Sequence, residues 1–297
     1  MTSVPFLGEA LSILAALIWA VSVVMFRMSG RALPPLALNA FKNVIAAILL
    51  VLTMVLLGQD ILRPVPASDY ILLAISGVLG IAISDTLFFK SLNIVGAGLS
   101  QIASLSYSPF VIIFTFLFIG ERLSGLDYVG AGLILMGILI TTTRKVPEGI
   151  TRSELRRGIL LATLSVALMA LSVVIAKPIL DRSPILWTTG VRLIAGIVAL
   201  IALSIVSPRH RSLWNVLRPS TSWKIAVPAA VLGTYVAMVV WVAGMKFTQA
   251  SVASILNQMS AIFVLPVAAV VLKEQITLKK IVAVVLALAG VVLVTFG

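Results

Sequence analysis

The sequence has no cysteine, one histidine and few charged residues: Lys, Arg, Asp and Glu make up 11% of its 297 residues. Without cysteine there can be no disulfide, no thiol nucleophile and no Cys-based metal site. A soluble domain needs roughly twice this charged fraction to cover its surface. The scarcity of charge therefore excludes an ordinary soluble fold.

Catalytic motifs are also missing. There is no P-loop, no HExxH, no GxSxG and no pair of intramembrane aspartates, and the single histidine, His210, falls in a predicted loop. We therefore expect no enzyme activity, no catalytic residues, no cofactor and no metal site.

The chain is instead rich in long apolar stretches, and 61% of its residues are hydrophobic. A helix of about 20 apolar residues crosses a hydrocarbon core of roughly 30 Å. The sequence predicts an all-α integral membrane protein with ten transmembrane helices and no room for a soluble domain. The predicted spans are 9–28, 36–57, 70–89, 94–119, 125–143, 158–177, 185–206, 223–245, 249–272 and 278–296.

The second half of the sequence repeats the first. Rare residues keep register at a shift of 150, and from the third span onward at 153: Pro34 with Pro184, Lys42 with Arg192, Glu121 with Glu274 and Gly137 with Gly290. Five spans per repeat is an odd number, so the second repeat must enter the membrane from the opposite side. We predict a first five-helix repeat at 1–145, a basic connecting loop at 146–157 and a second, inverted repeat at 158–297.

The net charge of +12 indicates how the chain is oriented in the membrane and does not indicate nucleic-acid binding. Fifteen of the 22 Lys and Arg residues fall in one set of alternate loops, and five fall on the opposite side with both termini. Because cytoplasmic loops are enriched in Lys and Arg, loop 144–157 is predicted to be cytoplasmic and both termini outside.

Asp85 is the one acidic residue well inside a span, and two basic residues, Lys42 and Arg192, lie at matched positions in the second and seventh spans. A charge within the membrane is costly, which makes Asp85 a candidate for proton or cation handling. The alternative is structural pairing with Lys90 or another basic neighbour. Lys42 and Arg192 either extend toward lipid headgroups or face a central vestibule, where they would hold a carboxylate or a helix C-terminus and take part in coupling or gating.

Polar residues at helical spacing run along the fourth span and its mate, the ninth, and include Gln101, Asn257 and Gln258. Such a stripe is expected to face inward, because lipid would leave it unsatisfied. Pro109 and Pro266 each remove a backbone donor, and so we predict helix breaks there. Interrupted helices at matched positions point to a transport site, although Ser and Asn also join helices. Glu121 and Glu274 are predicted to set tight turns after these spans.

These features resemble the drug/metabolite transporter (DMT) superfamily, in its EamA type with two five-helix repeats. The resemblance rests on Leu17-Ile18-Trp19-Ala20, the basic residue of spans two and seven, the run 92–98 leading to Pro109, and Gly120-Glu121-Arg122-Leu123 with its second copy at 273–276. It implies a ten-helix secondary transporter, often an exporter of amino acids or other metabolites. The substrate-binding residues that it selects are Trp19, Asp85, Phe89, Gln101, Tyr107, Tyr235, Trp241, Asn257 and Gln258.

The expected partners are a small-molecule solute and the lipid bilayer of the cell membrane, with proton coupling through Asp85 as a further hypothesis. No nucleic-acid partner is expected, and the oligomeric state is left open between monomer and homodimer. Two alternatives to solute transport remain: a flippase for lipids or lipid-linked precursors with the same fold, and a membrane-embedded enzyme, against which a lone buried acid argues.

Overall fold

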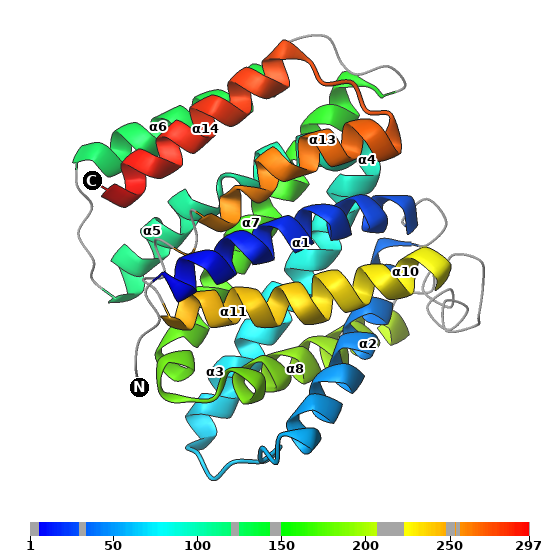
Figure 1. Ribbon diagram of the computed structural model, residues 1–297, viewed down its shortest axis with the longest axis vertical. Helices are drawn as coiled ribbons and strands as arrows, with labels where there is room; N and C mark the ends of the chain where they lie inside the picture. The colour runs from blue at the N-terminus through cyan, green and yellow to red at the C-terminus, as the bar shows by residue number, and fades with distance from the viewer. Residues whose placement is uncertain are drawn as a thin grey trace.

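The computed structural model describes residues 6–29, 34–119, 125–142, 150–206, 223–247, 253 and 256–296, and all regular elements within them are helical (Figure 1). The first half contains α1 (Leu7–Ser29), α2 (Pro35–Leu56), α3 (Ala67–Gly77), the π-helix η1 (Val78–Ser84), α4 (Asp85–Ser104), α5 (Tyr107–Ile119) and α6 (Gly125–Thr142). The second half contains α7 (Arg152–Arg182), α8 (Ile185–Val206), α10 (Trp223–Ala229), the π-helix η3 (Ala230–Val236), α11 (Ala237–Phe247), α13 (Ser260–Leu272) and α14 (Leu278–Phe296).

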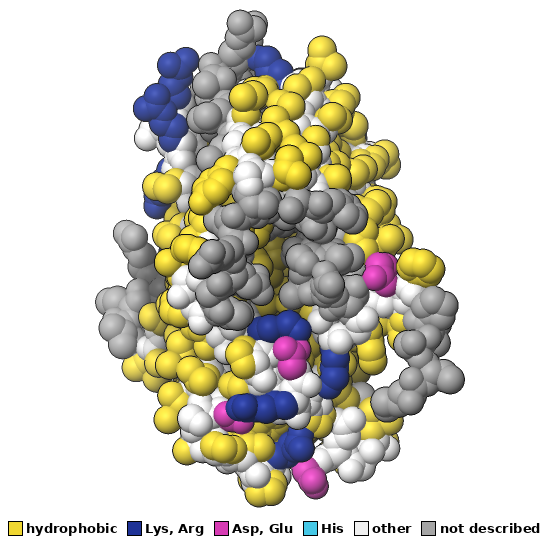
Figure 2. All heavy atoms as spheres, turned by 90° about the vertical axis from the view of Figure 1, so that its left-hand side faces the viewer, with side chains coloured by type: hydrophobic (Ala, Val, Ile, Leu, Met, Phe, Trp, Pro, Cys, Tyr) yellow, Lys and Arg dark blue, Asp and Glu magenta, His cyan; other side chains and the backbone are white. Residues whose placement is uncertain are grey.

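Six helical stretches in the described residues are long and apolar enough to cross a membrane. They are Leu7–Ser29, Pro35–Leu56, Ala67–Ser104, Arg152–Arg182, Ile185–Ile205 and Trp223–Phe247. Many of their large apolar side chains are exposed, as a lipid-facing surface requires. Figure 2 instead looks onto one set of helix ends, where Lys, Arg, Asp and Glu side chains gather in the lower half among hydrophobic ones. The chain is a multi-pass, all-helical membrane protein.

The helices of the two halves are interleaved. In Figure 1, α6 and α14 lie side by side at one end of the molecule, while α2, α3 and α8 gather at the other. Between these ends, α1 packs against α11 and α13, and α7 packs against α4 and α5. The bounds of α5 and α13 differ by 153 residues at both ends, as do the starts of α6 and α14. The start of α1 and the end of α14 lie on the same side.

The structure differs from the predicted boundary between the third and fourth spans. The helix continues through the expected loop and bends at Gly96, whose φ of 82° and ψ of 176° are not helical. A φ in this region favours glycine because no Cβ obstructs it. Residues 97–104 then lead to a second break at Leu105 and Ser106, so that the fourth span is a helix in two pieces.

Helix α7 is also longer than the predicted span 158–177. Its start is fixed by a capping box: the Glu154 backbone N–H donates to Thr151 Oγ1 at 3.2 Å, and the Thr151 backbone N–H donates to Glu154 Oε2 at 2.7 Å. Reciprocal bonds of this kind satisfy donors that the first helical turn leaves free. The basic residues of the second half's first turn therefore belong to a helix rather than to a loop.

The π-helices η1 and η3 lie at matched positions in the two halves, at a shift of 152 residues. Gly80 in η1 contacts Ser172, and Gly233 in η3 contacts Ser22, so closely that a Cβ at either glycine would clash. Serine pairs join η1 to α7, since Ser84 Oγ donates to the Ser165 carbonyl at 2.8 Å and Ser165 Oγ returns the bond at 2.9 Å. Helices of opposite halves therefore approach at small and hydroxyl residues, as is common in membrane proteins.

Candidate functional site

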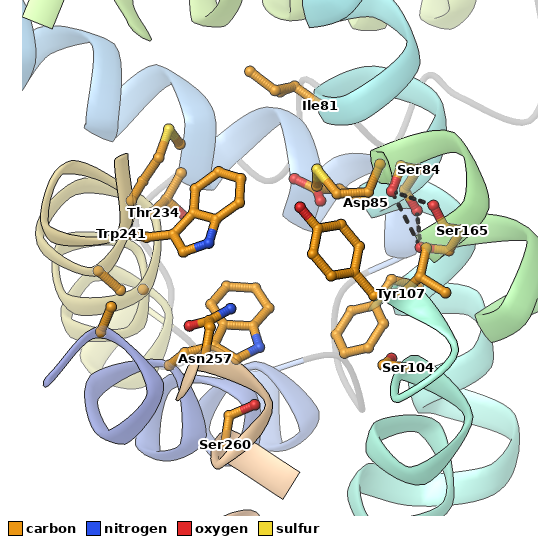
Figure 3. A pocket seen from close by; sticks show the side chains of 18 of the residues that line it. Ile81, Ser84, Asp85, Ser104, Tyr107, Ser165, Thr234, Trp241, Asn257 and Ser260 are labelled. Atoms are coloured by element: carbon orange, nitrogen blue, oxygen red, sulfur yellow. Dashed lines mark hydrogen bonds between the residues drawn. The ribbon is translucent and has the colours of Figure 1, made fainter. Parts of the chain in front are cut away.

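A cavity of about 170 Å³ lies between the two halves of the chain. Its walls come from α1, α2, η1 with α4, and α5 of the first half, and from α7, α8, η3 with α11, residues 257–258 and α13 of the second. Figure 3 shows Trp241 and Tyr107 on opposite walls, Asp85 behind them, and Asn257 and Ser260 along a third side. Seven of the nine predicted substrate-binding residues line the cavity: Trp19, Asp85, Gln101, Tyr107, Trp241, Asn257 and Gln258. Lys42 and Arg192, predicted to take part in coupling or gating, line it as well.

Lys42 and Asp85 form an ion pair in the cavity wall, with Nζ 2.6 Å from Oδ2. Both side chains are shielded, at 3% and 15% exposed. The Lys42 ammonium also lies 5.6 Å from the centre of the Phe89 ring and donates to Asn43 Oδ1 at 3.4 Å. The partner of Asp85 is thus Lys42 of α2, and the predicted alternative, Lys90, is exposed. Lys42 faces the cavity and holds a carboxylate.

Arg192, the counterpart of Lys42 on α8, is 7% exposed and lines the same cavity. Its Nη2 donates to Ser172 Oγ at 3.2 Å. In the described part of the chain no carboxylate lies within ion-pair distance of it, and position 238, which corresponds to Asp85, is methionine. Lys42 and Arg192 therefore occupy equivalent positions in the two repeats, but of the two only Lys42 is paired with a carboxylate in the described residues.

The two interrupted helices meet at their breaks. Gln101 Nε2 donates to Ser260 Oγ at 2.8 Å, and Gln258 Nε2 donates to the Leu105 carbonyl at 3.4 Å. Pro109 has no N–H to offer the carbonyl four residues before it, which is that of Leu105, and this frees the carbonyl for Gln258. The first break thus lies at Leu105 and Ser106, with Pro109 in the first turn of α5, whereas Pro266 lies within α13, which continues through it.

Glu274 holds the upstream piece of the fourth span. Its carboxylate accepts the Ala97 N–H at 2.9 Å and the Gly98 N–H at 3.2 Å, and Lys280 Nζ lies 3.4 Å away. Glu274 therefore does more than set a turn in its own half, because it caps a helix of the other half. The helix that it caps carries Gln101 into the cavity. Glu121 lies outside the described residues.

Replacement of Glu274 with alanine is expected to lower the free energy of unfolding by about 1–2 kcal/mol, the usual cost of losing a helix cap. Thermal unfolding of the purified protein in detergent measures the change. Asp60→Ala is the matched control, because Asp60 is an exposed acid. Equal effects of the two substitutions would show that the cap contributes nothing.

Two predicted residues, Phe89 and Tyr235, are absent from the described lining of the cavity. Phe89 is 1% exposed and packs edge-on against Phe26, with ring centres 5.2 Å apart. The Tyr235 hydroxyl is hydrogen-bonded to Thr53 Oγ1. The aromatic residue of α4 that does face the cavity is Phe88.

Sequence reasoning also missed Thr189, Thr234 and Phe88 as lining residues. The repeat holds a signal for two of them. Phe88 corresponds to Trp241 at the shift of 153, and Thr189 precedes Arg192 by three residues, as Asn39 precedes Lys42. Thr234 corresponds to Ile81, which gives no polar signal.

The comparisons agree with this architecture. The profile of the EamA-like transporter family matches residues 6–143 and again 156–296. The chain has no significant match among functionally curated proteins. It is similar to a solved structure titled only "Crystal structure of protein", with a TM-score of 0.70 and 19% identity over 97% of this chain and 96% of that one. This likeness shows a shared fold, and the two profile matches show that the chain belongs to the EamA-like transporter family.

Proposed function

We propose that the protein is a secondary active transporter that exports a small metabolite such as an amino acid by alternating access around the central cavity. Its ten helices form two inverted five-helix repeats, at 1–145 and 158–297, joined by the basic segment 146–157, whose last six residues begin α7, and these repeats rock against each other. The site comprises the candidate residues described above, with Lys42, Asp85 and Arg192 in coupling or gating.

The observation that carries this proposal is the matched lining of the cavity. Eighteen of its 23 lining residues form nine pairs related by the repeat. Three pairs follow the shift of 150 and six the shift of 153: Ala15 with Ser165, Trp19 with Met169, Lys42 with Arg192, Ile81 with Thr234, Ser84 with Ala237, Asp85 with Met238, Phe88 with Trp241, Ser104 with Asn257, and Tyr107 with Ser260. A cavity on the axis between inverted repeats can open to either side by equivalent movements of each half.

The size of the cavity favours a small solute. A volume of about 170 Å³ holds roughly a dozen waters, or a metabolite with about as many non-hydrogen atoms. Trp19, Phe88 and Trp241 supply apolar surface, and hydroxyl and amide groups supply polar contacts, which is the usual make-up of a small-molecule site.

For orientation we propose that the basic loop 144–157 faces the cytoplasm and both termini face outward. The Lys and Arg bias supports this, and so does the position of the start of α1 and the end of α14 on one side of the molecule (Figure 1).

Proton coupling through Asp85 is testable in proteoliposomes with an imposed pH gradient. Asp85→Asn is expected to abolish the dependence of transport on that gradient, because the amide keeps an oxygen for Lys42 but carries no titratable proton. The rate is measured per folded protein, with Asp60→Asn as the matched control. Coupling that survives Asp85→Asn would place the proton site elsewhere.

A thermal-unfolding screen of the purified protein against amino acids, nucleosides, sugars, polyamines and monocarboxylates tests the proposed function, because a bound substrate stabilises the native state by mass action. We expect stabilisation by one class of small metabolite, followed by its transport in proteoliposomes. Stabilisation by lipids alone would favour the flippase alternative. Chemical conversion of the bound compound would favour a membrane-embedded enzyme.

A further inference from the structure

The two halves of the cavity differ in how they neutralise their basic residue. In the first half Lys42 is paired with Asp85 at 2.6 Å. In the second half the equivalent positions are Arg192 and Met238, so the repeat supplies a buried cation without its acid. A buried charge without a counter-ion is costly, and it is retained where it binds something.

Unpaired polar atoms gather around the same cavity. In the described residues, nine buried side-chain polar atoms have no hydrogen-bond partner in the protein, and six of these belong to lining residues. The six are Gln101 Oε1, Tyr107 OH, Thr189 Oγ1, Arg192 Nε, Thr234 Oγ1 and Trp241 Nε1. Buried polar groups are normally satisfied, so this concentration indicates a site shaped for a polar ligand.

The chemistry of these atoms selects the ligand. The Arg192 Nε–H and Trp241 Nε1–H can only donate, and the hydroxyls of Tyr107 and the threonines can donate as well. A ligand that satisfies Arg192 and Trp241 must accept hydrogen bonds, whereas Gln101 Oε1, the sixth atom, can only accept them. Guanidinium groups bind carboxylates through a planar pair of donors, and such charge-assisted bonds are strong.

The net charge of the cavity lining also favours an anionic solute. Among the described lining residues Lys42 and Asp85 cancel, and Arg192 leaves one positive charge. One negative charge on the solute neutralises it. A zwitterion would bring an ammonium group as well, but the one acidic side chain in the described lining, Asp85, is already held by Lys42.

Building on the proposed transport function, we infer that the solute is a monocarboxylate anion with an apolar body. Its carboxylate binds Arg192, in the role that Asp85 plays beside Lys42. Its apolar body lies against the aromatic walls formed by Trp19, Phe88 and Trp241.

Thermal unfolding of the purified protein tests this with five probes that share a phenyl group and differ in the charge and shape of their polar head. These are 3-phenylpropanoate, its neutral amide 3-phenylpropanamide, zwitterionic phenylalanine, cationic 2-phenylethylamine, and phenyl phosphate. We expect 3-phenylpropanoate to raise the unfolding temperature in a concentration-dependent way and the other four to have smaller effects.

Two substitutions sharpen the result. Arg192→Gln should weaken binding of 3-phenylpropanoate by roughly 100-fold or more, because it removes the charge and the paired donors. Arg63→Gln is the matched control, since Arg63 is a partly buried arginine outside the cavity lining. Met238→Asp keeps Arg192 but supplies the missing carboxylate. It should raise the unfolding temperature without any ligand and abolish the response to 3-phenylpropanoate.

The inference is overturned if 3-phenylpropanoate does not stabilise the protein, if any other probe stabilises it as well, or if the response survives Arg192→Gln. Uptake into proteoliposomes separates this result from the proposed function. A carboxylate that binds through Arg192 but never crosses the membrane would contradict the proposed transport function, while the inference about the binding site would stand. A neutral or zwitterionic solute that is transported would do the reverse.

Discussion

Asp85→Met, which installs in the first half the residue found at position 238 of the second, is expected to lower the free energy of unfolding by about 3–5 kcal/mol. The reason is the partner that it leaves behind. The Lys42 side chain is 3% exposed and its ammonium lies 2.6 Å from the Asp85 carboxylate. Removing only the acid leaves a buried cation with no counter-ion.

The double variant Lys42→Met with Asp85→Met should recover most of that loss, because apolar residues can replace both members of a buried ion pair at little net cost. Unfolding of the two single variants and the double variant completes a double-mutant cycle. Lys177 and Asp181, an ion pair one helical turn apart on α7 with side chains 24% and 53% exposed, provide the more solvated control cycle. A coupling energy for Lys42 and Asp85 no larger than that of the control pair would contradict the burial described here.

The second large effect is expected from Thr234→Trp, which fills the cavity. Thr234 is 3% exposed, its hydroxyl has no partner among the described residues, and it stands beside Trp241 in Figure 3. A tryptophan there would occupy the solute's space. Because even one surplus methylene in a fitted apolar pocket costs about 10–200-fold, transport should fall by roughly 100-fold or more.

The fold should survive this change, with a stability loss of about 1–3 kcal/mol at most, the usual range for overpacking. Leu117→Trp is the control, since Leu117 is 64% exposed on α5, away from the cavity lining. Proteoliposome uptake and thermal unfolding are measured on both variants. Unchanged transport by a folded Thr234→Trp protein would mean that the solute takes another route.

Much of the arrangement could be predicted from the repeat, because a duplicated sequence carries spatial information that a single one does not. The pairing of Lys42 with Arg192 and the inward position of Gln101 and Gln258 follow from register and from the cost of facing lipid. The ion pair between Lys42 and Asp85 does not follow. It depends on how α2 packs against the start of α4, which no local pattern contains.

The aromatic residues show what the family resemblance leaves open. The resemblance points to Phe89, whereas the structure turns Phe88 to the cavity, and it points to Tyr235, whose hydroxyl bonds to Thr53. Both positions lie at the π-helices, since Phe89 follows η1 and Tyr235 lies within η3. A π-helical turn holds more residues than an α-helical turn, so the face assigned by α-helical spacing is displaced. Sequence gives no strong signal for such a turn.

The helix breaks were displaced for a related reason. Pro109 removes a hydrogen bond to the carbonyl of Leu105, so its effect appears one turn upstream of the proline itself. Gly96 lies in the first half, and Glu274, which caps the helix that begins after Gly96, lies in the second. The two residues are 178 positions apart in the sequence, and only the folded chain brings them together.

Alternating access through this cavity can be tested most directly by thiol labelling, because the sequence contains no cysteine and a single one can be introduced on a silent background. Ser104→Cys places it in the cavity wall (Figure 3). A membrane-impermeant thiol reagent is added to either side of proteoliposomes during transport. We expect labelling from both sides, with a solute gradient shifting the balance between them. Labelling from one side alone, whatever the gradient, would contradict alternating access through this cavity.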